Sequence, residues 1–535
     1  MESRFFPSDV TVDAALAMMN LGTPQPTESF ESPEDRISSY FGRLNYNFLN
    51  KFLLSVTMRA DGSSKFAEGN RWGYFPSVAG AWRISDEPFV SGIDFLSNLK
   101  LRLSYGTAGN NRIGDDMWKM VYTTNDDDKP YFVDEDLQNQ LVPGSTIANP
   151  DLKWETTYTR NAGLDFGFFN NRIDGSFDAY YNTTKDLLIR ANIPSNTGFN
   201  YQMQNIGETS NQGVELALNG RIIQQRDFTL SASFNIAFNI NNVEKLGDVK
   251  MSLQSSEWYG SSSGPTGDYL LKEGEPVGQM WGYVTDGMYK YSDFNYDPAT
   301  ESYTLKEGVP DNSTLIGARF FGPGTLKFKD LGGEGDAINP EDDRTIIGNA
   351  NPDHTGGFNL QATYKGFDFS AFFNWVYGND VYNANKLEFT SFPDTRLYGN
   401  LLSSMNWEDR FSIVHPETGD FVYSPEGLQM LNQNVEIWHP MMSRVVLHSW
   451  AIEDGSFLRL NNVTLGYTLP ENLTSRFFVD KLRFYVTGYN LWTLTNYTGY
   501  DPEVDTRRST PLTPGVDYSA YPRSRSIIAG VNLTF

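Results

Sequence analysis

Apolar and polar residues alternate one by one along many stretches of this chain, and this period of two constrains the fold more than any other feature. From Phe228 to Ile240 every second residue is apolar, whereas Thr229, Ser231 and Ser233 lie between them. Successive side chains of a β-strand point to opposite faces, so the pattern predicts a strand with one apolar and one mostly polar face. The same pattern recurs at residues 51–61, 99–105, 172–181, 367–377 and 526–535. We count roughly fourteen such strands along the chain.

Short and long connections separate the predicted strands. The short ones lie near residues 48–51, 168–172, 222–227 and 364–368, and the long ones near 110–153, 243–276, 291–354, 378–445 and 493–522. The two classes alternate well up to residue 242 but less cleanly from 277 to 456, where the strand count stays open. Barrels of bacterial outer membranes have short periplasmic turns and long external loops. The sequence therefore predicts an all-β fold, a transmembrane antiparallel β-barrel with long extracellular loops.

Aromatic residues are abundant, with 37 Phe, 29 Tyr and 11 Trp in 535 residues. Many lie near predicted strand ends, as in the pairs Tyr180–Tyr181 and Tyr489–Trp492, where rings can sit at the level of the lipid headgroups. No apolar run approaches the ~18 to 20 residues that a spanning helix needs. A soluble β-sandwich with an aromatic core is the alternative, but strands this numerous would make an unusually large one.

Charge and residue usage exclude several classes of function. The formal net charge is −24, so nucleic acid is not an expected partner. The chain has no cysteine, which excludes thiol catalysis and thiolate metal sites. Its four histidines have neither metal-ligand spacing nor a convincing catalytic partner. We therefore expect the chain not to be an enzyme.

Several longer stretches occur in an order that is itself informative. They are residues 58–89, which contain "GNRWGYFPSVAGAWRISDEPF", and residues 96–114, 149–188, 205–220, 456–470 and 482–504, the last containing "NYTGYDPEV". In sequence and in order, these stretches resemble the SusC/RagA class of TonB-dependent outer-membrane transporters. The resemblance covers nearly the whole chain from about residue 36.

The resemblance implies a 22-stranded barrel in the bacterial outer membrane, closed by an N-terminal plug. It also implies a SusD-like surface lipoprotein as a lid, energy supplied by the TonB complex, and import of oligosaccharides or oligopeptides. We recognise no plug, TonB-binding segment or signal peptide, and about eight of the 22 strands are not accounted for. We therefore expect residues 36–535 to be the C-terminal portion of the barrel and residues 1–35 to be an irregular segment. Alone, the chain is not expected to transport actively.

Two other functions remain open at this stage. One is a passive porin-like or adhesive outer-membrane barrel, and the other is a secreted soluble β protein that binds glycans. The plug would separate the first from a gated transporter. The identity of the substrate cannot be inferred from these residues.

Aromatic residues in the predicted loops are candidates for contacts with a substrate, because flat rings suit sugar faces and peptide side chains. The candidates are Trp118, Tyr122, Trp258, Tyr259, Trp407 and Trp438. For any one of these residues, packing within the loops is the more common role.

An acidic stretch at residues 326–349 resembles a calcium-loop-like segment common in the SusC/RagA class. Its hard oxygen donors, which suit Ca²⁺, are Asp330, Glu334, Asp336, Asn339, Glu341 and Asp342. The third position of the loop is Gly332 rather than Asn or Asp, so the spacing is degenerate. We weigh a solvated acidic loop slightly above a metal site and expect no other cofactor.

The last predicted strand ends on an aromatic residue. Phe535, Leu533 and Val531 share its apolar face, and Asn532 and Gly530 lie on the other. The terminal aromatic resembles the C-terminal signal by which the barrel-assembly machinery recognises outer-membrane barrels. We therefore expect the first face to contact membrane lipid and the second to face the barrel lumen.

Overall fold

The structure is a computed structural model. It describes residues 2–4, 28–30, 35–90, 92–124, 131–133, 136–138, 141–144, 146–193, 195–199, 201–247, 249–259, 267–332, 337–393, 399–506 and 511–535. No helix in these residues is long and apolar enough to cross a membrane.

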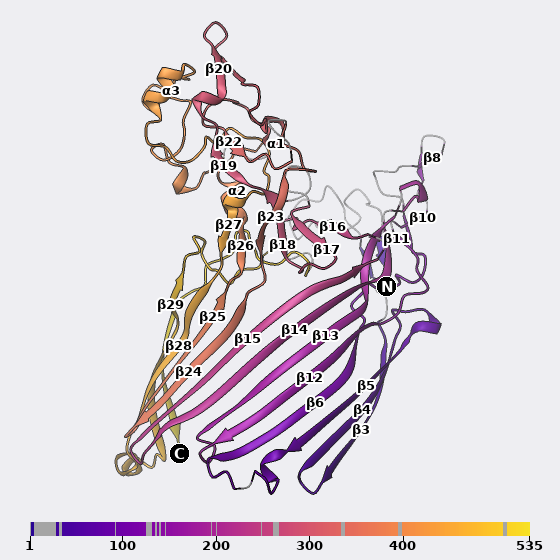
Figure 1. The fold of residues 1–535 in the computed structure, drawn as a ribbon, viewed down its shortest axis with the longest axis vertical. Helices are drawn as coiled ribbons and strands as arrows, with labels where there is room; N and C mark the ends of the chain where they lie inside the picture. The colour runs from indigo at the N-terminus through magenta and orange to yellow at the C-terminus, as the bar shows by residue number, and fades with distance from the viewer. Residues whose placement is uncertain are drawn as a thin grey trace, which may run out of the picture.

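One large curved sheet dominates the described residues (Figure 1). Its long strands are, in spatial order, β3 (Ile37–Phe48), β4 (Phe52–Ser63), β5 (Trp72–Arg83), β6 (Leu96–Asn110), β12 (Glu155–Phe168), β13 (Ile173–Asn192), β14 (Tyr201–Gln224), β15 (Phe228–Leu246), β24 (His354–Tyr364), β25 (Phe367–Tyr377), β28 (Phe457–Thr468), β29 (Lys481–Thr495) and β31 (Ser526–Thr534). Each is antiparallel to its neighbours, and β11 (Thr146–Ile147) adds a short parallel ladder to β14, which makes 14 strands. The predicted antiparallel fold of roughly fourteen strands is confirmed.

The register of the ladders separates the two faces of the sheet. One row of paired residues runs across β4, β5, β6, β12, β13 and β14 as Leu54, Gly80, Leu103, Ala162, Ala179 and Val214. A neighbouring row on the opposite face of β6, β12, β13 and β14 is Arg102, Gly163, Asp178 and Glu215. Because the side-chain period is two, this register places whole rows of apolar residues on one face and whole rows of polar residues on the other.

The connections at the two ends of the sheet differ in length. The lower end in Figure 1 has tight turns at residues 49–51, 169–172, 225–227 and 365–366. Several of these turns place residues such as Asn50 and Asn170 at positive φ, a conformation that asparagine tolerates better than most residues. Two connections of intermediate length, residues 84–95 and 469–480, also lie at this end, and the longest connections lie at the other end. Among the described residues between 277 and 456, where the strand count was open, β24 and β25 are the strands that join the large sheet.

Three long connections fold together into one body, which we call the head. The head consists of the described residues within 247–353, 378–456 and 496–525. It lies above β24, β25, β28 and β29 (Figure 1). Its strands are β16 (Met251–Gln254), β17 (Tyr269–Lys272), β18 (Gln279–Tyr283), β19 (Thr285–Met288), β20 (Phe294–Asp297), β21 (Ser302–Leu305), β22 (Leu326–Phe328), β23 (Arg344–Asn349), β26 (Asp380–Asn383), β27 (Ile452–Asp454) and β30 (Val516–Asp517). Its α-helices are α1 (Ser313–Ile316), α2 (Ala384–Glu388) and α3 (Pro425–Leu431).

Smaller elements complete the described structure. They are β1 (Glu2–Arg4), β2 (Glu28–Phe30), β7 (Tyr122–Thr124), β8 (Tyr131–Val133), β9 (Asp136–Gln138), β10 (Leu141–Pro143) and α4 (Glu471–Thr474). β1 pairs with β2, β7 with β10, and β8 with β9.

Buried apolar residues concentrate in the head and in one smaller cluster near the other long connections. One head core contains Trp258, Tyr269, Met280 and Tyr382, and the smaller cluster centres on Phe66. The large sheet itself buries few large side chains, and its apolar face is solvent-accessible along most strands. An exposed apolar face of this extent requires a covering, because soluble monomers rarely expose patches beyond a few hundred Å².

Candidate functional site

The polar face of the sheet carries its charges as ion pairs between strands. Arg102 of β6 contacts Asp165 of β12 at 2.8 Å and Asp178 of β13 at 2.9 Å. Lys100 adds a third contact, 2.6 Å from Asp165. Arg102 and Asp178 lie two strands apart, with Gly163 of β12 between them in register. A Cβ built at Gly163 would lie 2.4 Å from the Asp178 carboxylate, so the missing side chain leaves room for this pair.

The same arrangement recurs farther along the sheet. Arg483 of β29 contacts Asp368 of β25 with two nitrogens, at 2.8 and 2.5 Å. The strand between them, β28, presents Gly466, whose Cβ would lie 2.5 Å from both partners. A bidentate contact of this kind is both strong and geometrically specific. In each case one glycine on the middle strand allows an ion pair to join three strands.

A third cluster lies where β28 reaches the head. Arg459, whose side chain is only 3% exposed, contacts Asp501 at 2.5 Å and Glu503 at 2.8 Å. Arg523 contacts the same two carboxylates at 2.9 and 3.0 Å. The cluster thereby fixes the connection between β29 and β31 to the polar face of the sheet. Its carboxylates belong to the "YDPEV" stretch, whose role the sequence alone did not reveal.

The predicted aromatic candidates have different environments. Trp258 is 2% exposed and donates a hydrogen bond from Nε1 to the Tyr382 hydroxyl at 2.7 Å. Tyr259 packs against the same core, 5.2 Å from the Trp258 ring. Trp438 is 3% exposed and packs against Trp450. In this conformation Trp258 and Trp438 act as core residues of the head.

The remaining three candidates are more accessible. Tyr122 is 58% exposed on β7, and Trp407 is 48% exposed in the head, with the Arg410 guanidinium 4.6 Å from its ring. Trp118 is partly buried against the cluster around Phe66. The structure does not bring the six candidates together into one site, and their role in binding stays a prediction.

The acidic stretch forms a loop held by its own backbone. Asp343 is buried and accepts hydrogen bonds from the backbone N–H groups of Leu331, Gly332 and Asn339. Asn339 accepts two more through its Oδ1 atom, from the N–H groups of Glu341 and Asp342. These side chains therefore stabilise the turn.

The candidate metal ligands within this stretch are only partly described. Asp330, Asn339, Glu341 and Asp342 belong to the described residues, whereas Glu334 and Asp336 lie outside them. Among the residues that the structure describes, no three histidine or acidic side chains are grouped closely enough to hold a metal ion. The calcium site stays a prediction.

Two histidines, His439 and His448, are buried in the head and contact hydroxyl groups that are far away in sequence. His439 accepts a hydrogen bond at Nδ1 from the Met441 N–H, so its other ring nitrogen, 2.9 Å from the Thr325 hydroxyl, carries the proton and donates. His448 lies 2.8 Å from the Thr285 hydroxyl. Burial lowers the pKa of each imidazole to about 3, and neighbouring cations add to the effect. Both rings are therefore neutral parts of the core.

The buried arginine predicts a stability effect. When Arg459 is replaced with Met, Arg523 is the one cation left to pair with Asp501 and Glu503. We expect the free energy of unfolding to fall by about 3 kcal/mol, since truncating one member of a buried ion pair leaves charge uncompensated. The loss of stability is followed as a decrease in the temperature at which the folded band disappears from a semi-native gel. Arg43→Met, which removes an exposed arginine bonded to Asn45 and Ser55, is the control, and equal temperatures for the two variants would refute the assignment.

The histidines predict that the head loses stability in acid. In the unfolded chain each imidazole takes up a proton near its ordinary pKa of 6.5. In the folded head each imidazole stays neutral until the pH falls to about 3. Stability therefore falls as the pH drops below 6.5, by up to about 1.4 kcal/mol per pH unit for each histidine.

Hydrogen exchange of residues 437–450 at pH 7 and pH 5, corrected for intrinsic rates, measures this loss. Replacing both His439 and His448 with Gln should reduce the difference between the two pH values, and His415→Gln should not. Equal protection at both pH values in the unmodified protein would contradict the prediction.

Comparisons with known proteins agree with this geometry. The family model described as "TonB dependent receptor-like, beta-barrel" matches residues 8–314. The chain is 34% identical over 520 residues to TonB-dependent receptor P3 of Formosa agariphila, covering 96% of this chain and 47% of that protein. It is 32% identical over 510 residues to TonB-dependent receptor SusC of Bacteroides thetaiotaomicron, covering 93% of this chain and 43% of that protein.

Solved structures give the same result. The structure of the RagAB peptide transporter matches with a TM-score of 0.72 and 26% identity, over 98% of this chain and 50% of the other. The chain thus spans about half the length of the relatives that it matches. Members of this family are receptors for transport rather than enzymes, which agrees with the sequence prediction. The chain belongs to the TonB-dependent receptor-like β-barrel family of the outer membrane and is of the SusC/RagA type.

Proposed function

We propose that this chain forms the C-terminal part of the barrel of a TonB-dependent transporter, which imports oligosaccharides or oligopeptides across the outer membrane. The match to the RagAB peptide transporter along 98% of the chain carries the proposal. SusC supports it as a second relative of the same type.

The polar face of the sheet fits the wall of such a transporter. Arg102, Arg459 and Arg483 are each paired with carboxylates. A polar solute that moves along this face meets hydrogen-bonding groups but few uncompensated charges. Such a wall suits large polar substrates that must pass without being held.

The two outer strands of the sheet support assembly with further strands. In the described residues, β3 pairs only with β4, and β31 pairs only with β29. Unpaired strand edges in lipid would leave backbone groups without hydrogen bonds. We propose that other strands of the complete transporter, with its plug and its link to TonB, pair with these edges and close the barrel.

A SusD-like surface lipoprotein is the proposed partner of the head. The head rises beyond the ends of the strands (Figure 1) and exposes large apolar side chains such as Trp407, Phe421 and Met430. The accessible Tyr122 and Trp407 are the proposed substrate contacts among the six aromatic candidates. For the acidic stretch we still place a solvated loop slightly above a Ca²⁺ site made by Asp330, Glu334, Asp336, Asn339, Glu341 and Asp342.

The C-terminal strand retains its proposed role in assembly. Val531 and Leu533 lie opposite Phe484 and Leu482 on the apolar face, and Phe535 is 81% exposed. This is the arrangement we propose for recognition by the barrel-assembly machinery and for contact with lipid.

Uptake by cells tests the proposal. Cells that produce the complete transporter are given fluorescent oligosaccharides or oligopeptides, and uptake is compared with and without TonB and the lipoprotein. We expect uptake of at least one class, and we expect it to fall to background without TonB, because a plugged barrel needs energy to open. Co-purification of the lipoprotein is the expected readout for the partner.

Two outcomes would redirect the proposal. Uptake that persists without TonB would support the passive porin alternative, and surface binding without uptake would support the adhesive one. The secreted soluble alternative does not fit a chain of this family.

A further inference from the structure

Arg160 lies on the apolar face of the sheet. The register of β5, β6, β12 and β13 places Val78, Tyr105, Arg160 and Tyr181 side by side in one row. The next row toward the short turns is Gly80, Leu103, Ala162 and Ala179. Arg160 therefore interrupts a face that is otherwise apolar at this level of these strands.

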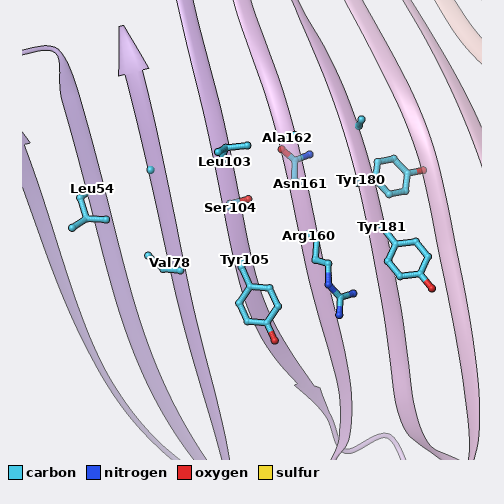
Figure 2. A pocket seen from close by; sticks show the side chains of 12 residues that line it. Leu54, Val78, Leu103, Ser104, Tyr105, Arg160, Asn161, Ala162, Tyr180 and Tyr181 are labelled. Carbon is cyan, nitrogen blue, oxygen red and sulfur yellow. The ribbon is translucent and has the colours of Figure 1, made fainter.

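The surroundings of Arg160 leave its charge available. Its guanidinium lies 5.9 Å from the centre of the Tyr105 ring and 5.5 Å from that of Tyr181, and Figure 2 shows it between the two rings. Within the part of the chain that the structure describes, its one side-chain hydrogen bond is a long one of 3.4 Å to the Thr183 hydroxyl. Among the described residues, no carboxylate lies within salt-bridge distance of it, in contrast to Arg102, which contacts two.

A groove adjoins this arginine. It has a volume of about 640 Å³ and is lined by residues of β4, β5, β6, β12 and β13 (Figure 2). In the row that lines it, Ala162 and Ala179 are neighbours and form a low stretch, Leu103 stands beside Ala162, and Gly80 lies on the other side of Leu103. A Cβ at Gly80 would meet no atom within 4 Å. The groove is thus a shallow, open and mostly apolar depression with a cation beside it.

The position along the strand gives the depth in the membrane. Arg160 is eight residues from Phe168, which begins the short turn, so it lies about 26 Å away along the strand. Such strands are tilted by roughly 35–45°, so this length corresponds to about 18 to 21 Å of height, within an apolar band that is about 25 Å tall. The next row beyond Arg160 contains Tyr158, Thr183 and Ser210 and is polar. Since long connections face outward, Arg160 lies near the outer end of the apolar face, from where its long side chain can reach the headgroups of the outer leaflet.

We propose that this groove binds one phosphorylated lipid of the outer leaflet, with the lipid phosphate on Arg160 and an acyl chain against Ala162 and Ala179, beside Leu103. The planar guanidinium can give two parallel hydrogen bonds to a phosphate. The tyrosines can hold it in this orientation. The inference rests on the outer-membrane location but not on which substrate the transporter carries.

Native mass spectrometry of the complete transporter in detergent tests the proposal. The probes are lipid A that carries its phosphates and the same lipid A after enzymatic removal of the phosphates. We expect one phosphorylated lipid to be retained, and Arg160→Gln to weaken its binding about tenfold, the value of a lost charged hydrogen bond. Arg160→Lys keeps the positive charge but loses the two parallel hydrogen bonds, so its retention should lie between that of Arg160→Gln and that of the unmodified protein.

Two further variants separate the phosphate contact from the groove. Ala162→Leu should fill the low stretch beside Leu103 and lower retention while Arg160 is intact. Arg43→Gln, which removes a charge from the polar face, should leave lipid binding unchanged.

Three results would overturn the proposal. They are equal retention by Arg160→Gln and the unmodified protein, equal retention of the lipid without phosphates, and displacement of the lipid by inorganic phosphate alone. A dimer that buries this groove without bound lipid would also refute it. The comparison of the two lipids on the unmodified protein keeps the proposal testable even if a variant fails to fold.

Discussion

The structure depends on one constraint, that the backbone groups of its long strands pair with neighbouring strands while their side chains meet two different environments. Backbone groups in a bilayer have no water to bond with, so each strand that crosses it must be paired on both sides. The alternation of residues in β14 and β15 then fixes the register, since a shift by one residue would turn every apolar side chain to the polar face. The head and the ion pairs are built on strands whose positions this register has already set.

The ion pairs of the polar face depend on that register, because it places their partners opposite one another across a middle strand. Arg102 with Asp178, and Arg483 with Asp368, each bridge a middle strand at a glycine. A larger residue at Gly163 or Gly466 would occupy the space of the pair. These glycines therefore have a role in joining three strands, beyond conformational freedom. The result is a face that is polar and largely compensated in charge, whereas Arg160 on the opposite face is left uncompensated.

The sequence predicted the strands well because their signal is local. The alternation in residues 228–240 and the short turns could be recognised without knowing any partner strand. It did not resolve residues 277–456, because the head is an irregular body whose short strands pair across long distances in the chain. Tyr382 pairs with both Ile452 and Val516, for example, and no local pattern marks such contacts.

The candidate residues were harder to predict than the strands. Trp258 and Trp438 are loop residues in the sequence but core residues of the head, since burial depends on what the loop packs against. His439 was set aside because its partner Thr325 is far away in the chain. Arg160 gave no signal because a single cation among strand residues does not reveal which face it is on. Only the register between β6, β12 and β13 places it on the apolar face.

The most direct test of the account asks which face of β14 contacts water. The chain has no cysteine, so single cysteines can be introduced at each position from residue 213 to 218 in the complete transporter in cell membranes. With a charged, membrane-impermeant thiol reagent applied to opened membranes, the account predicts labelling at 213, 215 and 217 and protection at 214, 216 and 218. Uniform labelling, or labelling with the opposite phase, would contradict a sheet with lipid on one face and an aqueous lumen on the other.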